Sequence, residues 1–416
     1  MVMKFGGTSV ADAQRIKQAA RRIVARKEEG RRVVVVLSAR GKTTDELIAM
    51  AQEVSPAPDP RELDMLLSTG ERISCALCAM AIHDLGHQAI SLTGSQAGIV
   101  TDTSHTKARI LDVRADRIEA ALGDGAIALV AGFQGVSTAR DVTTLGRGGS
   151  DTTAVALAAA VGAEVCEIYT DVAGVFNADP RLVPGARKLG VVSFEEMLEM
   201  AASGAGVLQL RAVEYARTHG VRIHCRSSFD EAPGTLVISE EETMEHPLIT
   251  AVTHSTDEAR VTLLGVPDEP GVAGRIFTAL ADANVNVDMI IQNEPVSDDI
   301  QAEISFTVPR DDLRVAREAL EPIVAQLGMA PIVTDEGMGK VSIIGAGMKS
   351  HPGVAAKVFR TLGDEGINIE MIATSPIKIS CVVRGDQVPR AVQKLHAAFE
   401  LGEDAVVAEH PFGASA

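Results

Sequence analysis

Apolar runs and amphipathic segments alternate along the first 240 residues of the chain. Residues 33–37 are an unbroken run of valine and leucine, which is typical of a strand buried on both faces. Residues 126–131 and 164–169 also have the pattern of buried strands, and the apolar positions of residues 64–85 have helical spacing. The alternation predicts an α/β fold, namely an αβα sandwich in which helices cover both faces of a mostly parallel central sheet.

The second half of the chain contains two copies of one pattern. Residues 261–265 match residues 341–345, and each copy continues with a Pro-Gly turn, a helix and further strand. This order is half or more of a ferredoxin-like βαββαβ unit. Residues 248–254 also have the pattern of a strand, which could complete either copy. The expected division is a first domain at 1–240, a linker with a possible shared strand at 241–257, and two repeat units at 258–337 and 338–416.

Composition and charge narrow the class of protein. The formal net charge of −17 argues against non-specific binding of nucleic acid, which requires a basic surface. No apolar run approaches membrane-spanning length and residues 1–9 lack the apolar core of a signal peptide, so we expect a cytoplasmic protein without a membrane partner. Cys75 and Cys78 have redox or metal spacing, but their apolar surroundings indicate small core residues.

Two glycine-rich turns carry the candidate chemistry. Residues 143–154 place Arg147 beside two glycines, then a hydroxyl and a carboxylate, directly before an alanine-rich helix. Residues 4–9 place Lys4 before a second Gly-Gly turn. A glycine turn that opens a helix presents free backbone N–H groups and a partial positive charge, which suit phosphate or carboxylate groups. Neither turn has the spacing of a P-loop, and together they suggest two anionic ligands held face to face.

Three further polar segments directly follow predicted strands. They are Ser38, residues 132–135, and the pair Thr170 and Asp171. Functional loops of parallel sheets lie at the carboxyl ends of the strands. All three segments are therefore expected to join one site at one edge of the sheet.

Five segments and the repeat are together similar to one family. The segments are residues 4–9, 70–72, 146–153, 170–175 and 178–181. With the repeat, they resemble the aspartokinases, members of the amino-acid kinase family that carry tandem ACT domains. The resemblance implies ATP-dependent phosphorylation of the side-chain carboxylate of L-aspartate to 4-phospho-L-aspartate, the first step towards lysine, threonine and methionine. It also implies Mg²⁺ held mainly by the nucleotide phosphates, without a separate metal site on the protein.

The resemblance and the side-chain chemistry together suggest roles. By resemblance, Lys4 lies along the β- and γ-phosphates and screens the developing charge together with Mg²⁺. Arg147 is the best candidate to bind a substrate carboxylate bidentately, and Glu71 is expected to pair with the aspartate amino group. Asp151 orients either Lys4 or the substrate ammonium, and both roles stay open. The predicted catalytic residues are Lys4, Arg147, Gly149, Ser150 and Asp151.

The predicted ligand contacts form two groups. The aspartate-binding residues are Thr43, Thr44, Asp45, Glu71, Arg147, Gly148, Gly149 and Ser150. The nucleotide-binding residues are Lys4, Phe5, Gly6, Gly7, Ser38, Ser150, Thr170, Asp171, Phe176, Asn177, Ala178, Asp179, Pro180, Arg181 and Gly206. Two alternatives remain, because Glu71 and Arg72 could form a surface ion pair and Asp179-Pro180 could be a plain turn.

The repeat is expected to bind amino-acid effectors, lysine and/or threonine, between ACT units, and to make the chain a homo-oligomer. By resemblance, the effector residues are Asn286, Val287, Asp288, Gln292, Val354, Ala355, Asn368, Ile369, Ser375 and Pro376. The alternative is a repeat that only dimerises the chain by pairing sheet edges. The repeat looks most like the actinobacterial type, in which lysine and threonine inhibit together. In that type an internal start, near Met244 in this chain, also supplies an ACT-only subunit.

The chain departs from the family pattern at three positions. Gly206 stands where the family has a lysine that contacts ATP phosphate, so nucleotide binding or transfer should be weaker unless Lys188 or another cation substitutes. Arg40 replaces a common methionine, and Pro376 replaces a usual acidic residue at the effector site, which suggests relaxed feedback. Two other functions stay open: a kinase for another or a modified amino acid in a specialised pathway, and a non-catalytic amino-acid-sensing regulator.

Overall fold

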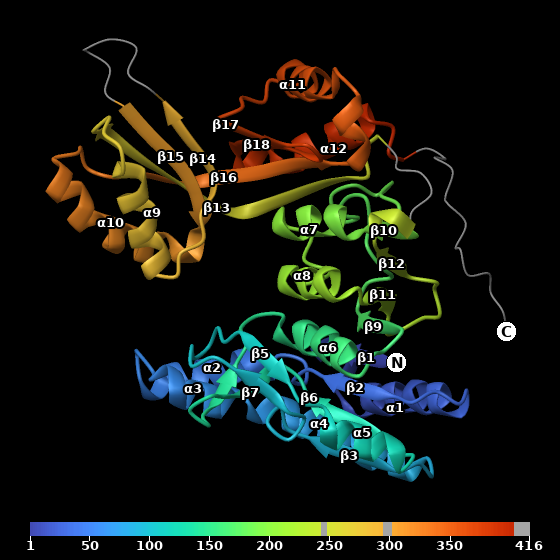
Figure 1. Ribbon diagram of the computed structural model, residues 1–416. Coiled ribbons are helices and arrows are strands. Elements are labelled where there is room, and N and C mark those ends of the chain that lie inside the picture. Colours follow the sequence, from blue (N-terminus) through green and yellow to red (C-terminus); the bar gives the residue numbers. More distant parts are fainter. Residues whose placement is uncertain (243–247, 294–301, 403–416) are drawn as a thin grey trace.

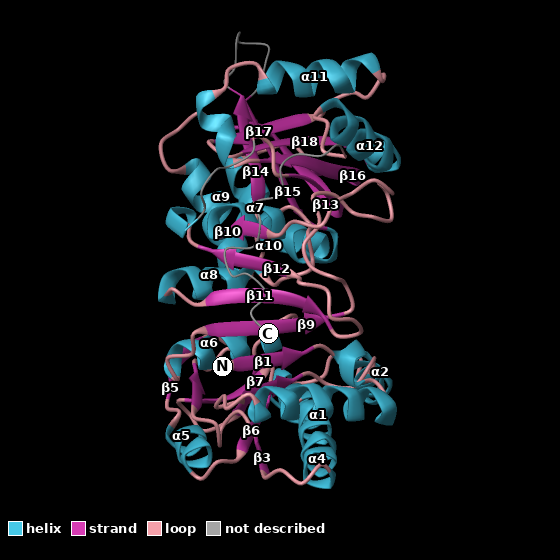
Figure 2. Cartoon of the chain, turned by 90° about the vertical axis from the view of Figure 1, so that its right-hand side faces the viewer, coloured by secondary structure: helices cyan, strands magenta, loops and turns pink. Residues whose placement is uncertain are grey.

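The first part of the chain is built on one eight-stranded sheet in the computed structural model, which describes residues 1–242, 248–293 and 302–402 (Figure 1). All neighbouring strands are parallel except β11 and β12. Figure 2 shows the strands stacked from β3 through β6, β1, β9, β11 and β12 to β10. In sheet order they are β10 (Val191–Ser193), β12 (Thr235–Ile238), β11 (Arg222–Ser227), β9 (Val165–Thr170), β1 (Val2–Phe5), β2 (Val34–Leu37), β6 (Ile127–Ala131) and β3 (Ala89–Leu92).

Helices cover both faces of this sheet because successive side chains of a strand point to opposite faces. On one face, Met3 and Phe5 pack with α1 (Ala13–Glu28) and α4 (Thr69–Asp84). On the other face, Val2 packs in the core of a second helix layer. The helices of that layer are α5 (Asp116–Gly123), α6 (Gly149–Ala160), α7 (Phe194–Ala202) and α8 (Leu210–His219). The expected αβα sandwich is confirmed.

The stretch Pro60–Asp84 is long and apolar enough, by length and composition alone, to cross a membrane. It consists of α3 (Pro60–Leu67) and α4, which meet at Ser68, where a single helix was expected from the sequence. Helix α4 packs against α1, β3 and β6, and it carries the buried carboxylate of Glu71 in its first turn. These contacts make the stretch part of the protein core.

A four-stranded sheet lies beside the large one. Its strands are β5 (Ile110–Val113), β4 (Ile99–Thr101), β7 (Gln134–Ser137) and β8 (Val142–Thr144). Helices α2 (Thr43–Val54) and α3 pack on each other, and α3 also packs on β8. Because β8 runs into the glycine turn that opens α6, this sheet is connected directly to the candidate site.

The C-terminal part contains one six-stranded antiparallel sheet with two separate cores. In sheet order its strands are β14 (Asp288–Asn293), β15 (Ala302–Pro309), β13 (Ala251–Val266), β16 (Val333–Ile344), β18 (Lys378–Arg384) and β17 (Met371–Ser375). Helices α9 (Val272–Asp282) and α10 (Leu313–Leu327) cover one core, and α11 (Val354–Asp364) and α12 (Val388–Ala398) cover the other. The two helix pairs lie on separate parts of the sheet in Figure 1.

The two long central strands are shared between these units. The beginning of β13, residues 251–255, pairs with residues 340–344 at the end of β16, whereas residues 260–262 pair with residues 333–335 at its beginning. The strand expected near 248–254 therefore pairs with the second copy, although it precedes the first. Much of the segment interpreted as a linker, 241–257, is thus part of β13. Met244 and the C-terminal end, 403–416, lie outside the described residues.

All five cysteines are free and buried. Cys75 and Cys78 lie in the core between α4 and the sheet, and burial raises the pKa of Cys78 to about 12. A buried thiol that does not ionise near neutral pH is inert. This pair therefore consists of core residues.

Candidate active site

The carboxyl ends of four parallel strands bring most of the predicted site residues to one edge of the large sheet. Gly6 follows β1, Ser38 follows β2, Gly132 follows β6, and Thr170 ends β9. Strand β1 pairs in parallel with both β2 and β9, and β2 pairs in parallel with β6. The four turns therefore lie next to one another.

Lys4 and Asp151 form a buried ion pair at this edge. Lys4 Nζ lies 2.6 Å from Asp151 Oδ1, and the two side chains are only 11% and 9% exposed. Lys4 belongs to the central strand β1, and Asp151 lies in the first turn of α6, where the helix dipole favours a carboxylate. Of the two roles considered for Asp151, this geometry fits the orientation of Lys4.

Two glycines permit close contacts between the turns. A Cβ atom on Gly7 would lie 2.7 Å from the Ala39 carbonyl oxygen, so the turn after β1 packs directly on the turn after β2. A Cβ atom on Gly132 would lie 2.7 Å from Ser150 Oγ, so the turn after β6 meets the start of α6. The hydroxyls of Ser38 and Ser150 have no hydrogen-bond partner in the described part of the chain, which leaves both available to a ligand.

Arg147 lies in the turn that opens α6. The flanking Gly146 and Gly148 have φ angles of 80° and 70°, a left-handed conformation that favours glycine. Gln209 Nε2 donates a hydrogen bond of 2.6 Å to the Arg147 carbonyl oxygen. The exposed guanidinium makes no hydrogen bond or ion pair with residues 1–242, 248–293 or 302–402, so its planar donor edge can receive a carboxylate.

Glu71 is a buried, half-satisfied carboxylate in the first turn of α4. Its Oε1 accepts a hydrogen bond of 3.2 Å from the Ala39 N–H, and its Oε2 has no partner among the described residues. Burial raises the pKa of Glu71 to about 7, against the lowering effects of backbone hydrogen bonds and of Arg72. Arg72 instead donates to Gln134 Oε1 at 3.2 Å. The side chain of Glu71 is therefore not part of a surface ion pair.

Thr43, Thr44 and Asp45 form the first turn of α2. A Cβ atom on Gly70 would lie 3.5 Å from Thr43 Cγ2, so this turn packs against the start of α4 beside Glu71. Within the described residues, neither threonine hydroxyl has a partner. The predicted aspartate-side residues of α2 and α4 are thus neighbours.

Thr170 and Asp171 lie at the end of β9, next to the turn that follows Lys4. Thr170 Oγ1 donates to Asp171 Oδ1 at 3.1 Å, and the Thr170 carbonyl accepts a bond of 2.8 Å from the Ser228 N–H. The hydroxyls of Ser228 and Ser9 are 2.5 Å apart. The predicted nucleotide residues of β9 are therefore linked to the turn after β1.

Asn177 and Ala178 have surroundings that differ from the predicted ones. Asn177 Nδ2 donates to the Leu401 carbonyl at 2.9 Å, and Asn177 Oδ1 accepts from the Arg187 N–H at 2.8 Å. Ala178 packs in the core that α11 and α12 cover. Both side chains therefore contact the second ACT unit. The backbone of Asn177 is also bonded, because its N–H donates to the Arg187 carbonyl at 2.9 Å and its carbonyl accepts from the Val252 N–H at 2.8 Å. The local motif gave no sign of this packing, because the partners lie far away in the sequence.

The other residues of this segment are more accessible. Arg181 NH2 lies 2.7 Å from Asp179 Oδ2, and the Arg181 side chain is 87% exposed. Hydrogen bonding to Arg181 lowers the pKa of Asp179. Pro180 is exposed, and Phe176 forms an isolated bridge with Lys188. The pairing of Asp179 and Arg181 supports a turn and leaves the arginine able to reach an anion.

Gly206 lies in the loop between α7 and α8. A Cβ atom there would meet nothing within 4 Å, so the backbone packing does not require glycine at this position. By contrast, a Cβ atom on Gly204 would lie 1.9 Å from the His254 carbonyl oxygen of β13. The loop is thus packed on the ACT sheet at one point and open at Gly206.

The predicted effector residue Asp288 pairs with the buried Lys340, although the Asp288 side chain itself is 49% exposed. Lys340 Nζ lies 2.7 Å from Asp288 Oδ2 and 2.8 Å from Glu258 Oε1. Burial opposes the charge of Lys340, but the two carboxylates outweigh it and raise the pKa of Lys340. Of the other predicted effector residues, the exposed ones are Asn286, Gln292, Asn368 and Pro376, and the buried or half-buried ones are Val287, Val354, Ala355, Ile369 and Ser375.

Glu199 of α7 joins the sandwich to the second ACT unit. Its Oε2 lies 2.8 Å from Lys378 Nζ, and its Oε1 accepts a bond of 3.4 Å from Ser375 Oγ. Sequence reasoning missed Glu199, Gln209 and Lys340. Each is a single polar residue whose partner is distant along the chain, so no local motif marks it.

Comparisons with known families and proteins agree with this architecture. The model of the amino acid kinase family matches residues 1–227, and the model of the ACT domain matches residues 261–322 and 341–399. The aspartokinase of Mycobacterium bovis is 56% identical over 407 residues, which cover 97% of each chain.

Two solved structures of aspartokinase III from E. coli resemble this chain over nearly its whole length. The R-state complex with aspartate and ADP has a TM-score of 0.84 at 27% identity and covers 95% of this chain and 99% of that chain. The T-state complex with lysine and aspartate has a TM-score of 0.71 at 27% identity, and the match covers 96% and 99% of the two chains. The chain therefore belongs to the aspartokinases, within the amino acid kinase family.

Proposed function

We propose that the carboxyl edge of the eight-stranded sheet carries the aspartokinase reaction, with Lys4 and Arg147 as its two principal cations. The observation that carries this assignment is the buried ion pair of Lys4 with Asp151, which holds one cation at the centre of the edge. ATP phosphates are assigned to the turns after β1 and β2, and aspartate is assigned to the side of α2, α4 and Arg147. The E. coli relative was solved with both aspartate and ADP.

The nucleophile of the reaction is a carboxylate that is already ionised at neutral pH, so the protein does not need a general base. Its task is to bring two anions together and to stabilise the charge of the transferring phosphoryl group. Lys4 neutralises charge on the phosphoryl oxygens. Asp151 holds the ammonium in place, and Ser38 and Ser150 donate their free hydroxyls to the phosphates or to the substrate.

The aspartate side combines a guanidinium with a carboxylate. Arg147 binds a carboxylate of the substrate, and Glu71 binds its ammonium through the oxygen that lacks a partner in the described structure. Thr43, Thr44 and Asp45 complete this side. An exposed arginine and a buried glutamate at opposite ends of the substrate would also fix its orientation.

Mg²⁺ is assigned to the nucleotide phosphates, where it adds charge neutralisation when bound. The described residues contain no group of three or more histidine, cysteine, aspartate or glutamate side chains that could hold a metal ion. The nucleotide side further includes Thr170, Asp171 and Arg181. We place the enzyme in the cytoplasm, where its free thiols stay reduced.

Replacing Gly206 with lysine is expected to strengthen ATP binding. The position is open, so the side chain fits without rearrangement, and a cation there would attract the phosphates. We expect a KM for ATP lowered by about three- to tenfold, as a partly exposed charge contact is worth roughly 1 kcal/mol. Gly206→Met has similar length without charge and should leave this KM unchanged. Equal effects of the two variants would show that charge is not the cause.

The ACT half is proposed to bind lysine and threonine as inhibitors and to make the chain a homo-oligomer. The E. coli relative was solved with lysine in its T-state. Edge strands β14 and β17 expose the equivalent residues Ile290 and Ile372, at 54% and 42%, which suits pairing of ACT sheets. An ACT-only subunit starting at Met244 would retain all of β13, and hence the shared strand of both units.

Hydroxamate-trapped turnover of L-aspartate with MgATP tests the proposal. We expect turnover by the full chain and inhibition by lysine plus threonine together. Turnover that is not inhibited by lysine plus threonine would still support the catalytic assignment, and it would favour relaxed feedback at Pro376. A folded chain that binds ATP but turns over neither aspartate nor a panel of other amino acids would favour the non-catalytic regulator.

A further inference from the structure

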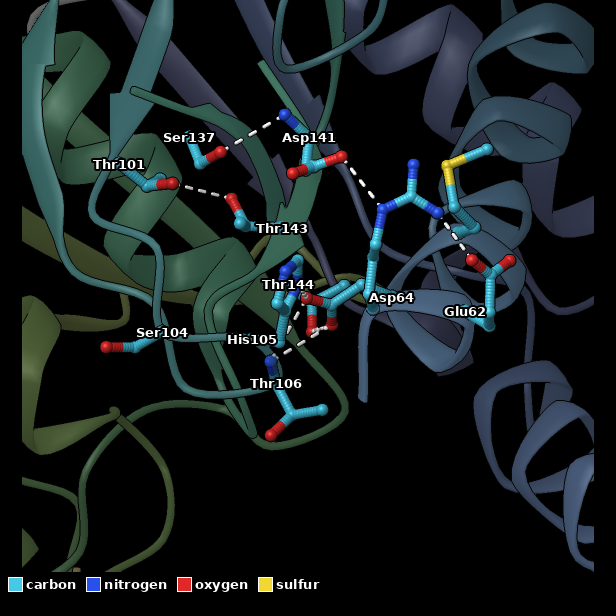
Figure 3. Close-up of polar contacts among 12 residues, drawn as sticks. Glu62, Asp64, Thr101, Ser104, His105, Thr106, Ser137, Asp141, Thr143 and Thr144 are labelled. Carbon is cyan, nitrogen blue, oxygen red and sulfur yellow. Dashed lines mark hydrogen bonds and ion pairs between the residues drawn. The ribbon is translucent and has the colours of Figure 1, made fainter. Parts of the chain in front are cut away.

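A buried carboxylate outside the predicted site connects three segments of the catalytic domain. Asp64 of α3 is fully buried, and the Thr144 hydroxyl donates to its Oδ1 at 2.5 Å (Figure 3). His105 Nδ1 lies 2.7 Å from Asp64 Oδ2, and the Thr106 N–H lies 3.1 Å from both oxygens. Asp64 thus binds donors from the end of β8 and from the loop between β4 and β5.

The end of β8 and the loop between β4 and β5 both contact or continue into the turn that carries Arg147. Thr144 ends β8, three residues before Arg147, and its carbonyl accepts a bond of 2.9 Å from the Ala108 N–H. The Thr106 carbonyl oxygen lies 3.2 Å from the position of a Cβ atom on Gly146, so the loop touches the start of the arginine turn. The turn itself contains two left-handed glycines, which provide little rigidity of their own.

The opposite side of the turn is held by α8. Arg211 donates to the Leu145 carbonyl at 2.8 Å and to the Ala108 carbonyl at 3.0 Å, and Gln209 donates to the Arg147 carbonyl. The guanidinium of Arg147 has no partner of its own in the described structure. The point at which its side chain leaves the backbone is therefore set by the contacts of Asp64 on one side and of α8 on the other.

We propose that Asp64 is a positioning residue for aspartate binding, because it fixes β8 and residues 105–106 in the arrangement that directs Arg147 towards the substrate carboxylate. The inference rests on the role proposed for Arg147. A buried carboxylate that accepts from a hydroxyl, a ring N–H and a backbone N–H holds its partners more tightly than neutral bonds do. An error of about 1 Å in a substrate-binding group is enough to weaken catalysis strongly.

The test is Asp64→Asn in the full chain. Asparagine keeps the side-chain volume but loses the negative charge and one of the two acceptor oxygens, so the anchor is weakened. We expect the KM for aspartate to rise at least tenfold while the KM for ATP changes less than twofold. Thr144→Val should raise the KM for aspartate by a smaller factor. Thr144→Ser keeps the hydroxyl, so its KM for aspartate should equal that of the unmodified chain.

Arg61→Ala is the matched control. Arg61 belongs to the same helix, and its Nε lies 2.9 Å from Asp141 Oδ1, just before β8. The polar partners of Arg61 in the described structure are Asp141 and Glu62, and neither belongs to the arginine turn. We expect both KM values of this variant to equal those of the unmodified chain. A lower melting temperature of Asp64→Asn with an unchanged KM for aspartate would overturn the proposal. If Asp64→Asn does not fold, the KM of Thr144→Val for aspartate tests the proposal instead.

A double-mutant cycle with Arg147→Ala separates this inference from the function on which it rests. If Asp64 acts through Arg147, Asp64→Asn should have little further effect on the KM for aspartate once the guanidinium is absent. Additive effects would contradict the positioning role of Asp64. An unchanged KM in Arg147→Ala alone would instead contradict the role proposed for Arg147, and this result would be obtained before Asp64 is altered.

Discussion

Lys4→Met is expected to lower kcat for aspartate phosphorylation by about 10²–10³-fold, the usual effect of removing one preorganised group that stabilises transition-state charge. Lys4 is buried on the central strand with its ammonium 2.6 Å from Asp151, so no bulk water replaces it when it is removed. The KM for aspartate should change far less, because Lys4 acts on the phosphoryl group and Arg147 and Glu71 hold the substrate.

This substitution also leaves Asp151 without its counter-charge. An unpaired buried carboxylate costs about 3–5 kcal/mol of folding stability, which would lower activity for a different reason. The double variant Lys4→Met/Asp151→Asn removes both charges and should recover much of the melting temperature while kcat stays low. Lys17→Met, at an exposed position of α1, is the control for the loss of a lysine. Recovery of kcat to within tenfold in the double variant would show that Lys4 has only a structural role.

The features predicted correctly from the sequence depend on neighbouring residues. The run at 33–37 is apolar at every position because helices cover both faces of β2, and it was recognisable without any knowledge of its partners. The turns at Gly7 and Gly148 were equally recognisable, because close packing or a left-handed φ excludes a side chain there. Local signals of this kind predicted the sandwich, the edge that gathers Lys4 and Ser38, and the repeat.

Contacts between distant segments were not predictable in this way. Asp64 is one acidic residue in an amphipathic helix, and only the fold brings it to Thr144 and His105. Asn177 appears in a nucleotide motif, yet its amide binds the Leu401 carbonyl of the second ACT unit. The strand β13 pairs first with the later repeat, since its register with β16 depends on which apolar faces meet in the folded sheet.

Glu71→Gln is expected to raise the KM for aspartate by about tenfold to a hundredfold, as a hydrogen bond to a charged group contributes roughly 1.5–3 kcal/mol. The effect should depend on pH. The pKa of about 7 means that Glu71 of the free enzyme is largely protonated at pH 6 and ionised at pH 8. Because kcat/KM reports the free enzyme, kcat/KM for aspartate should rise through pH 7 in the unmodified chain, and it should lack this rise in Glu71→Gln.

As pH rises, the folding stability of the unmodified chain should fall, whereas its kcat/KM for aspartate should rise. Burial raises the pKa of Glu71 above its usual 4.5 to about 7, so the fold prefers the protonated form and loses stability as pH rises through this range. At 1.36 kcal/mol per pH unit, the ionised side chain costs on the order of 3 kcal/mol at pH 8. Glutamine cannot ionise, so Glu71→Gln should melt above the unmodified chain at pH 8, with this advantage shrinking towards pH 5.

Two measurements over the same pH range therefore test one carboxylate. Melting temperatures without ligand report the cost of burying its charge, and kcat/KM for aspartate reports the use of that charge. Glu62→Gln is the control, because Glu62 of α3 is 66% exposed and should change neither curve. A pH-independent difference in melting temperature would contradict the raised pKa, and an unaltered kcat/KM would contradict the substrate contact. If both expected results are obtained, burial of the Glu71 charge destabilises the free protein, and the bound aspartate ammonium compensates that charge.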